Sequence, residues 1–474
     1  MEAPAATGRG RRATAVLPRR VRLGYGVGDL GASLTFVTLN TWLLYYLVNV
    51  ADVPPVQAGL VFLLGRAFDA ALDPLMGILS DRLRWRVGRL PFVRWGAPGL
   101  AALFAALWTV PALRPHHAFA AALVLSLLFS LAYTIVQVPY MALTPELAPD
   151  YDERTALSSY RVAFGTVASL LAVAVPPVVV LTVTPGSTLA GSAPGGWAVM
   201  GVLFGALTLF AYLVVARTVP EPAHPPQARP PARGLQDVRD AFRIAGYREL
   251  FASFVAITIG IMIVNSMLPF YLESALRIPG AQQTPVLGLL FGCAVAAFPL
   301  WNALSVRLGK RDALSLGLAV LVLGLLPLTL FAPAGRVGPT LLGLTVVAGC
   351  GLSAVMLLPW AMLPDVVEFD ELASGRRREG VVAALFTFGQ KLAGSVGVFA
   401  NAIAASLFGY VAGASLQAPG TVAGLRWMTG PVAAAVFVVA IVLVRRFPIT
   451  RAGHAAARAE LASRRAPPDP DRTL

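Results

Sequence analysis

Residues 65–74 read GRAFDAALDP, and they lie inside residues 56–80, VQAGLVFLLGRAFDAALDPLMGILS. The surrounding run is almost wholly apolar, and about 20 apolar residues are enough to cross a bilayer as a helix. Arg66, Asp69 and Asp73 nevertheless stand near the middle of this run. A charged side chain at membrane depth is costly unless it faces the protein interior or a wet cavity. The stretch therefore predicts a spanning helix whose charged face is turned toward other helices.

The composition of the whole chain agrees with this prediction. Of its 474 residues, 57% are hydrophobic and only 13% are charged, whereas a soluble protein carries roughly 25% charged residues. Apolar runs of spanning length recur along the chain, so the expected fold class is an all-α membrane protein. We predict twelve transmembrane helices, at residues 23–49, 56–80, 93–112, 118–146, 156–184, 196–216, 249–273, 284–306, 313–332, 339–362, 381–412 and 426–446.

The basic excess of the chain, a net charge of +14, is distributed by side of the predicted membrane. Of the 38 Lys and Arg residues, three lie inside spans and four lie on one side, at Arg114, Arg277, Arg336 and Arg426. The other 31 lie on the opposite side, which is the positive-inside pattern of a protein with both termini in the cytoplasm. We expect an integral inner-membrane protein whose basic residues contact lipid headgroups. No nucleic-acid partner is needed to explain the charge.

The longest hydrophilic interruption runs from Arg217 to Leu250 and divides the spans into six and six. Its first part is rich in Pro, which predicts an extended linker. Its second part has apolar residues at helical spacing, which predicts a short amphipathic helix on the membrane surface. The expected organisation is an N-terminal tail at 1–22, six-helix bundles at 23–216 and 249–446, a linker at 217–248 and a C-terminal tail at 447–474.

The two halves resemble each other in sequence. QVPYMALTPEL (residues 137–147) ends the fourth span, and LLPWAMLPDVV (357–367) ends the tenth. We expect charged loops, PDYDERT and EFDELASGRRREG, to follow these two spans, and SDRLRWRVGR after the second span parallels SVRLGKRDAL after the eighth. Two related six-helix bundles indicate a transporter that binds its substrate near the midplane and rocks one half against the other.

Asp69 and Asp73 are four residues apart and share one face of a helix, with Arg66 one turn earlier. One interpretation is a structural ion pair between Arg66 and one of the acids. That interpretation leaves the second carboxylate unexplained. Two neighbouring carboxylates can bind a cation together or share a proton, so we favour a cation site, with Arg66 in a structural role.

Lys391 lies in the middle of the eleventh span, LFTFGQKLAGSVGVF, and the chain has only one other lysine, Lys310, which we expect in a cytoplasmic loop. Lysine presents a compact charge and can release its proton, which arginine does not. Lys391 is therefore either a counter-ion of Asp69 or Asp73, or a group that links the binding of ion and substrate. The two roles are compatible.

Other polar residues in the spans suggest the walls of a cavity. Arg161, near the start of the fifth span, either binds an anionic or polyhydroxylated substrate or reaches the cytoplasmic interface. Tyr133, Thr134 and Gln137 lie on one face of the fourth span, where Thr134 and Gln137 offer neutral oxygens to a cation or bond to another helix. Asp29, at the start of the first span, is expected to be a first-turn or interfacial acid.

The chain shows no phosphate-binding loop, no metal-ligand spacing and no nucleophile with a base partner. We therefore expect no enzymatic activity and no cofactor. Transport would be driven by an ion gradient, with Na⁺ or H⁺ as the coupling ion, or by the gradient of the substrate itself.

Several motifs together resemble the glycoside–pentoside–hexuronide:cation symporters of the major facilitator superfamily. They are YGVGDLGAS, GRAFDAALDPLMG, VGRLPFVRWG, YTIVQVPYMALTPEL, DERTALSSYR, LLPWAMLPDVVEFDE and FGQKLAGSVG. The resemblance implies the superfamily fold of two six-helix bundles and covers the chain apart from its termini and the Pro-rich linker. QVPYMALT, SSYR and LLPWAMLPDV also resemble the lysophosphatidylcholine symporter branch of the family.

The resemblance also implies roles for single residues, because in the family the two acids of the second span bind the cation. The candidate residues are Asp69, Asp73 and Thr134 for the cation, Lys391 and Arg66 as charge partners, and Tyr133, Gln137, Arg161, Ser33 and Gln390 for the substrate. The chain departs from the sugar-binding members at Ser33 and Gln137, where they have acids, at Met141, where they have Trp, and at Leu72, where they have Asn.

The expected function is cation-coupled symport of a small solute, by family default a sugar or glycoside. The departures leave a lysophospholipid or another amphiphile as an alternative substrate. An alternative of another class is a membrane receptor or scaffold that transports nothing. We expect a monomer.

Overall fold

The computed structural model describes residues 17–110, 115–148, 151–221, 235–374, 379–414 and 416–449, together with residues 453 and 460. Helices make up the regular structure of these residues. The first half contains α1 (Arg19–Thr38), η1 (Leu39–Leu43), α2 (Leu44–Asn49), α3 (Pro55–Val87), α4 (Leu90–Leu107), α5 (Pro115–Leu147), α6 (Tyr151–Val183) and α7 (Pro194–Thr218). A short helix, α8 (Leu235–Ala241), follows.

The second half repeats this pattern of long helices. It contains α9 (Tyr247–Phe270), η3 (Tyr271–Ala275), α10 (Gly280–Ala296), α11 (Phe298–Leu308), α12 (Lys310–Phe331), α13 (Pro339–Ser374), α14 (Glu379–Leu407), α15 (Pro419–Trp427), η4 (Met428–Val432) and α16 (Ala433–Arg445). The segments η1, η3 and η4 are single π-helical stretches: η1 and η4 each join two α-helices, and η3 continues α9 and ends it.

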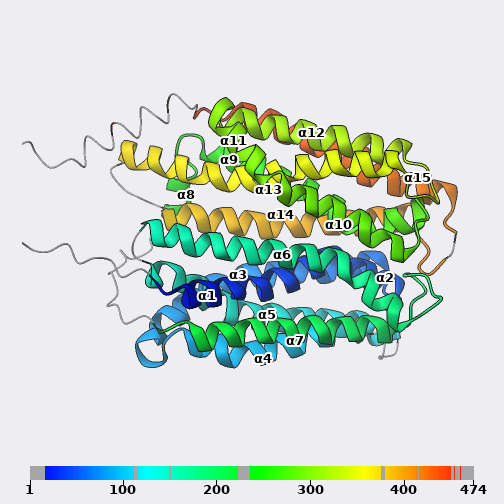
Figure 1. The fold of residues 1–474 in the computed structure, drawn as a ribbon, viewed down its shortest axis with the longest axis horizontal. Helices are drawn as coiled ribbons and strands as arrows, with labels where there is room; N and C mark the ends of the chain where they lie inside the picture. Colours follow the sequence, from blue (N-terminus) through cyan, green and yellow to red (C-terminus); the bar gives the residue numbers. More distant parts are fainter. Residues whose placement is uncertain are drawn as a thin grey trace, which may run out of the picture.

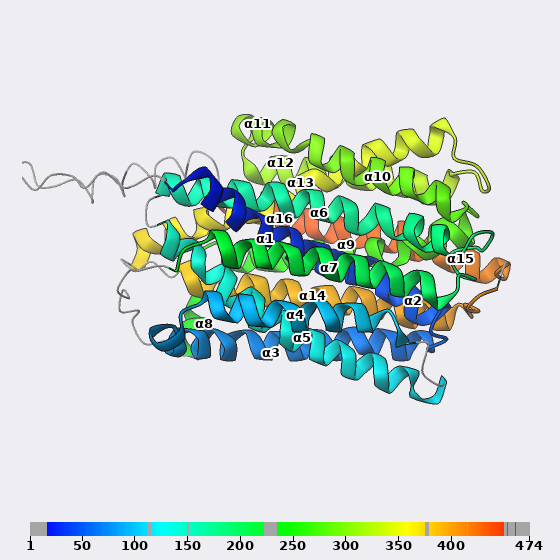
Figure 2. The same ribbon diagram turned by 60° about the horizontal axis from the view of Figure 1, so that its bottom comes forward.

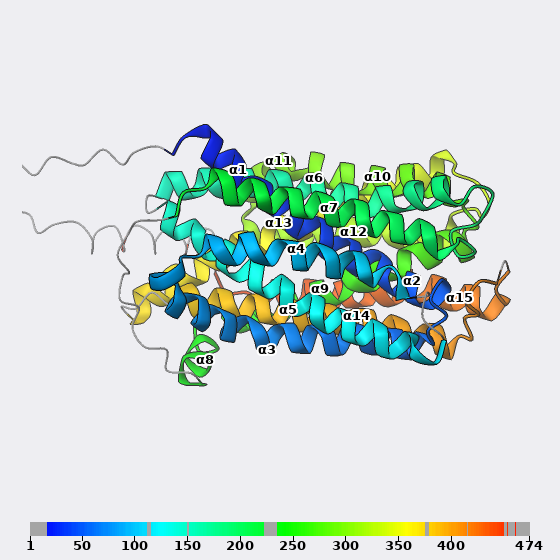
Figure 3. The same cartoon turned by 90° about the horizontal axis from the view of Figure 1, so that it is seen from below.

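The long helices run side by side along the longest axis of the molecule (Figure 1). The helices of the first half, coloured blue to green, lie in the lower part of this view, and those of the second half lie above them. All three views place α8 at one end of the bundle and α2 and α15 at the other (Figures 1, 2 and 3). We call these the α8 end and the α15 end.

Each of the twelve predicted spans coincides with a helix or a broken helix of the structure. Among the described residues, ten helices are long and apolar enough to cross a membrane, or eleven if the bent pair α10 and α11 forms one span. The helix α3 is not among these, although its 33 residues are long enough, and it is the helix that carries Arg66, Asp69 and Asp73. The all-helical fold is thus confirmed, while the number twelve stays a prediction.

The bend between α10 and α11 has a local cause. The two helices meet at an angle of 40° around Ala297. Pro299 stands in the first turn of α11, where it has no amide hydrogen to donate and its ring clashes with the preceding turn. The predicted eighth span, 284–306, is therefore two helices rather than one.

The charged loops predicted after the fourth and tenth spans are wrong in extent, because helices continue into these segments, as they do into the charged segment after the second span. Asp81 to Val87 belong to α3, the YDERT sequence opens α6 at Tyr151, and the EFDELAS sequence closes α13 at Ser374. Apolar content marks the part of a helix that lies in lipid, not the end of the helix itself. Charged residues continue a helix well, so the end comes only at a residue such as Gly88, whose φ of 82° is left-handed.

The predicted short helix after the linker is present as α8, and it contacts α14. The Pro-rich part of the linker and nearly all of both predicted tails lie outside the described residues. The boundaries of the two bundles and tails therefore stay predictions.

Small residues let the helices approach closely. A Cβ at Gly28 would lie 2.5 Å from the ring of Tyr140, and a Cβ at Gly351 would lie 2.3 Å from the amide nitrogen of Leu321. Gly351 thus packs α13 directly against the backbone of α12. In membranes, where lipid is as apolar as the helices, such close packing is a main source of helix association.

We expect Gly351→Ala to lower the stability of the protein by about 1–3 kcal/mol, because backbone atoms of α12 cannot move aside for the added methyl group. Gly343→Ala in the same helix is the matched control, since nothing lies within 4 Å of a Cβ there. Thermal unfolding in detergent measures both. Equal melting temperatures for the two variants would contradict the close approach of α12 and α13.

Candidate functional site

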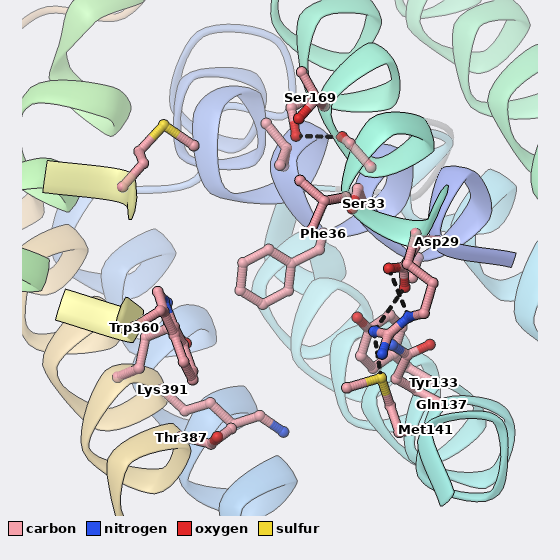
Figure 4. A pocket seen from close by; sticks show the side chains of 18 of the residues that line it. Asp29, Ser33, Phe36, Tyr133, Gln137, Met141, Ser169, Trp360, Thr387 and Lys391 are labelled. Atoms are coloured by element: carbon pink, nitrogen blue, oxygen red, sulfur yellow. Dashed lines mark hydrogen bonds and ion pairs between the residues drawn. The ribbon is translucent and has the colours of Figure 1, made fainter. Parts of the chain in front are cut away.

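A cavity of about 1000 Å³ lies between the two halves. Helices α1, α3, α5 and α6 line it from the first half, and α10, α11, α13 and α14 line it from the second. Figure 4 shows Trp360, Thr387 and Lys391 on one side and Asp29, Gln137 and Met141 on the other, with Phe36 between them. Most of the wall is apolar, formed by Phe36, Val37, Ala70, Pro74, Val138, Met141, Val162, Phe291, Ala294, Val295, Phe298, Met356, Leu357, Trp360, Ala384 and Phe388.

A cluster of charges crosses from one half to the other beside this cavity. The Lys391 ammonium on α14 lies 2.8 Å from Oδ2 of Asp69 on α3 and also forms an ion pair with Oδ2 of Asp73. The hydroxyl of Thr134 on α5 lies 2.9 Å from Oδ1 of Asp69 and 3.2 Å from Oδ1 of Asp73. Asp69 is almost fully buried, while Asp73 is 30% exposed and lines the cavity with Lys391.

The local sequence explains why the two carboxylates converge. Asp69 and Asp73 are one helical turn apart on α3, so both side chains point the same way. The helix α14 packs directly against α3, and a Cβ at Gly59 of α3 would lie 2.4 Å from Cβ of Ala402. This close packing brings Lys391 within reach of both carboxylates.

Arg66 contacts the same cluster from its other side. Its guanidinium lies 3.6 Å from Oδ2 of Asp69, donates to Oδ1 of Asn40 at 3.2 Å and lies over the ring of Phe36 at 4.4 Å. Asn40 belongs to η1, so Arg66 ties α3 to the first span. These contacts join two helices, and the structural role of Arg66 stays a prediction.

A second ion pair faces the cavity and corrects the prediction for Asp29. The guanidinium of Arg161 on α6 donates to both carboxylate oxygens of Asp29 on α1, at 2.9 and 3.2 Å. Both side chains are largely buried and line the cavity. The expectation of a first-turn or interfacial acid was wrong because α1 begins at Arg19, which places Asp29 about three turns into the helix. Arg161 likewise faces Asp29 rather than the interface.

Arg161 has a donor that a substrate oxygen could use. Its Nη2 lies 2.7 Å from the sulfur of Met141, and a thioether is only a weak acceptor. Figure 4 shows Met141 on the same side of the cavity as Asp29. An oxygen-bearing substrate could therefore replace this contact with a stronger one.

The other candidate residues also meet in this space. Ser33, Tyr133, Gln137 and Gln390 line the cavity, and the amide oxygen of Gln137 accepts a hydrogen bond of 2.9 Å from Tyr212. Asn401 on α14 donates to the backbone of Ile263 and to the hydroxyl of Ser266 on α9, and so joins these two helices. Lys310, which we placed in a loop, opens α12 and pairs with Asp365.

Sequence reasoning did not single out Phe36 and Trp360. The aromatic residue after Pro359 was noted only as part of the repeat, although an aromatic beside the predicted site was a usable signal. Within the described ranges, no group of three or more His, Cys, Asp or Glu side chains is arranged to hold a metal ion.

The Asp29–Arg161 pair gives a test of the cavity geometry. We expect Asp29→Asn to lower stability by about 3–5 kcal/mol, because it leaves a buried guanidinium without its counter-charge. The double variant Asp29→Asn with Arg161→Gln removes both charges and should recover part of this loss, which thermal unfolding in detergent would measure. Arg161→Gln alone completes the set of variants. If the stability loss of the double variant equals the sum of the two single losses, the ion pair is contradicted.

Comparisons with known proteins agree with this geometry. Residues 24–451 match the family described as MFS/sugar transport protein. An uncharacterized symporter of Synechocystis sp. is 27% identical over 94% of this chain and 96% of its own. The sodium-dependent lysophosphatidylcholine symporter 1 of Gallus gallus is 23% identical over 90% of this chain and 86% of its own.

Among solved structures, a bacterial homolog of the human lysosomal transporter Spinster, in an inward-facing and unoccupied conformation, has a similar fold. Its TM-score is 0.65 at 15% sequence identity, over 95% of this chain and 98% of that one. The relatives are membrane transporters rather than enzymes, and they give no support to the alternative of a receptor or scaffold. The resemblance seen in the sequence is confirmed, and the chain belongs to the MFS/sugar transport protein family of multi-pass membrane transporters.

Proposed function

We propose that this symporter uses Asp69, Asp73 and Thr134 as its cation site and Lys391 as a built-in competitor for that site. The observation that carries the proposal is the position of the Lys391 ammonium, between the two carboxylates of the other half. A free cation can bind both carboxylates only if the ammonium moves away. Lys391 already lines the cavity, so its displaced charge would face the substrate.

The coupling ion is Na⁺ or H⁺. The two carboxylates and the Thr134 hydroxyl supply only oxygen ligands, which hard cations prefer. Leu72 adds no ligand between the two acids. A proton needs only one of the carboxylates, and two neighbouring acids readily share a single proton.

The substrate that the family suggests is a sugar or glycoside. Ser33, Tyr133, Gln137, Arg161 and Gln390 offer donors and acceptors around the cavity. A volume of about 1000 Å³ is at the large end of ordinary ligand pockets.

A lysophospholipid or a similar amphiphile is the second candidate, and the apolar wall favours it. Phe36, Met356, Trp360 and Phe388 present hydrocarbon surface that sugar hydroxyl groups would not use. The polar headgroup would then lie against Arg161 and Lys391, with the chain along the apolar wall. The lysophosphatidylcholine symporter among the relatives supports this candidate.

The topology and organisation belong to the same proposal. Both termini and the α8 end would lie in the cytoplasm, as the distribution of Lys and Arg indicates. The protein would reside in the inner membrane as a monomer, surrounded by lipid. The boundaries at residues 216 and 249 would separate two bundles that rock against each other around the cavity.

Asp73→Asn should abolish uptake driven by an ion gradient in proteoliposomes, because the amide cannot balance a bound cation. Substrate exchange without a gradient should survive in part. Asp312→Asn is the matched control, since Asp312 is an exposed acid at the start of α12. Undiminished gradient-driven uptake by Asp73→Asn would refute the cation site.

Thermal-shift measurements distinguish the substrate classes and the ions. The purified protein is heated with sugars, glycosides or lysophospholipids, each with and without Na⁺. The correct class should stabilise the fold by about 2.7 kcal/mol at a hundredfold excess over Kd. A lysolipid effect that Trp360→Ala removes supports the amphiphile, whereas a sugar effect that survives Trp360→Ala supports a site built on the polar residues.

A further inference from the structure

Glu273 lies at the α15 end, away from the cavity, where it joins the two halves. Its Oε2 accepts a hydrogen bond from the hydroxyl of Tyr45 on α2, and its Oε1 accepts one of 2.9 Å from the backbone amide of Ala190. Tyr45 belongs to the first span, and Ala190 lies between α6 and α7. Glu273 itself lies in η3, in the first span of the second half. One carboxylate therefore receives hydrogen bonds from two separate segments of the opposite half.

Neighbouring contacts reinforce this junction. The ring of Tyr45 meets the ring of Phe270 edge-on, at 5.1 Å between centroids. Close to it, the hydroxyl of Tyr410 donates to Oδ1 of Asn49 at 2.8 Å, again from the second half to the first. A Cβ at Gly280 would lie 2.7 Å from Leu181, so α10 and α6 also pack tightly at this end.

Ion pairs at the α8 end are arranged differently. Arg22 with Glu153, Arg89 with Glu146, and Lys310 with Asp365 each join segments of the same half, and Arg89 lies in the turn between α3 and α4. The contacts around Glu273 instead hold one half to the other.

The local backbone is suited to a moving contact. The π-helical segment η1 directly precedes α2, which carries Tyr45, and η3 contains Glu273. Single π-helical turns inside α-helices occur often at functional sites. Here η1 lies inside the helix that carries Tyr45, and η3 forms the end of the helix that carries Glu273, in the corresponding spans of the two halves.

The energetics of a partly buried carboxylate also fit a contact that opens. Closing the α15 end removes the carboxylate of Glu273 from water, which costs free energy. In exchange, the carboxylate accepts hydrogen bonds from two neutral donors, the Tyr45 hydroxyl and the Ala190 amide. The two terms oppose each other, which lowers the net free energy that holds the closed state. A transporter can populate two states only if their free energies differ by a small amount.

We propose that Glu273, with Tyr45 and the amide of Ala190, is a gate that holds the α15 end closed and must open before the cavity can face that side. This inference rests on the alternating access of the proposed function. It assigns no role in binding the cation or substrate to Glu273.

Distance measurements between spin labels test the gate without a known substrate. Cys293 and Cys350 are first replaced by Ser. One labelled pair at the α15 end uses Gln57→Cys and Gln282→Cys, and a second pair at the α8 end uses Arg86→Cys and Arg445→Cys. All four positions are exposed, and each pair spans the two halves.

Tyr45→Phe keeps the aromatic ring but removes the hydroxyl, so it tests the hydrogen bond alone. We expect it to raise the population with a long α15-end distance about tenfold, as losing a hydrogen bond to a charged group implies. The α8-end distance should shorten in the same molecules. Glu273→Leu should act in the same direction, and the double variant should shift the population little further than the larger single effect.

The matched control is Tyr271→Phe, two residues from Glu273. Its hydroxyl donates to Leu328 and Thr329 within the same half, so its loss should leave both distances unchanged. Unchanged distances in Tyr45→Phe and Glu273→Leu would overturn the gate, as would an equal shift in Tyr271→Phe or a broadening at both ends without reciprocal change. Uptake is a separate measurement: if no candidate solute moves while the distances shift, the proposed function fails and the gate stands.

Discussion

The ion pairs of Lys391 with Asp69 and Asp73 constrain the rest of the structure, because they place one positive and two negative charges between the two halves. An unpaired charge at this depth would be costly in either half alone. Arg66, Thr134 and the close packing at Gly59 all serve to hold the cluster in place. The wide apolar cavity beside it is tolerable because the charges are already compensated.

The pairing of Asp29 with Arg161 solves the same problem within the first half. Both side chains face the cavity, and each would be an uncompensated charge without the other. The cavity thus has a charge cluster that crosses the halves and an ion pair that does not. Motion of one half against the other would change the charge cluster of Lys391 and leave the Asp29–Arg161 ion pair intact. Arg161 can therefore keep its position while Lys391 moves.

The sequence predicted the spans and the carboxylate cluster because their signals are local. Asp69 and Asp73 share a helix face through their spacing, and Lys391 stands out because it is the lysine inside a span. The pairing of Asp29 with Arg161 could not be predicted in this way, since the partners are 132 residues apart. The contact of Tyr45 with Glu273 spans 228 residues and depends on how the halves meet. Helix ends were misjudged where charged segments, such as the one ending at Ser374, continue the helix beyond the apolar run.

The same charges explain why the two ligands of a symporter would bind together. A cation that takes the carboxylates of Asp69 and Asp73 leaves the Lys391 ammonium without its partners, in a cavity whose wall is mostly apolar. That loss opposes binding of the cation alone. A substrate oxygen that accepts a hydrogen bond from the ammonium would offset this free-energy cost. The substrate can form that hydrogen bond only after the ammonium has left the carboxylates. Under the proposed function, each ligand would favour the other by the same free energy, as linkage requires, and the coupling would reside in the displaced lysine rather than in any direct contact between cation and substrate.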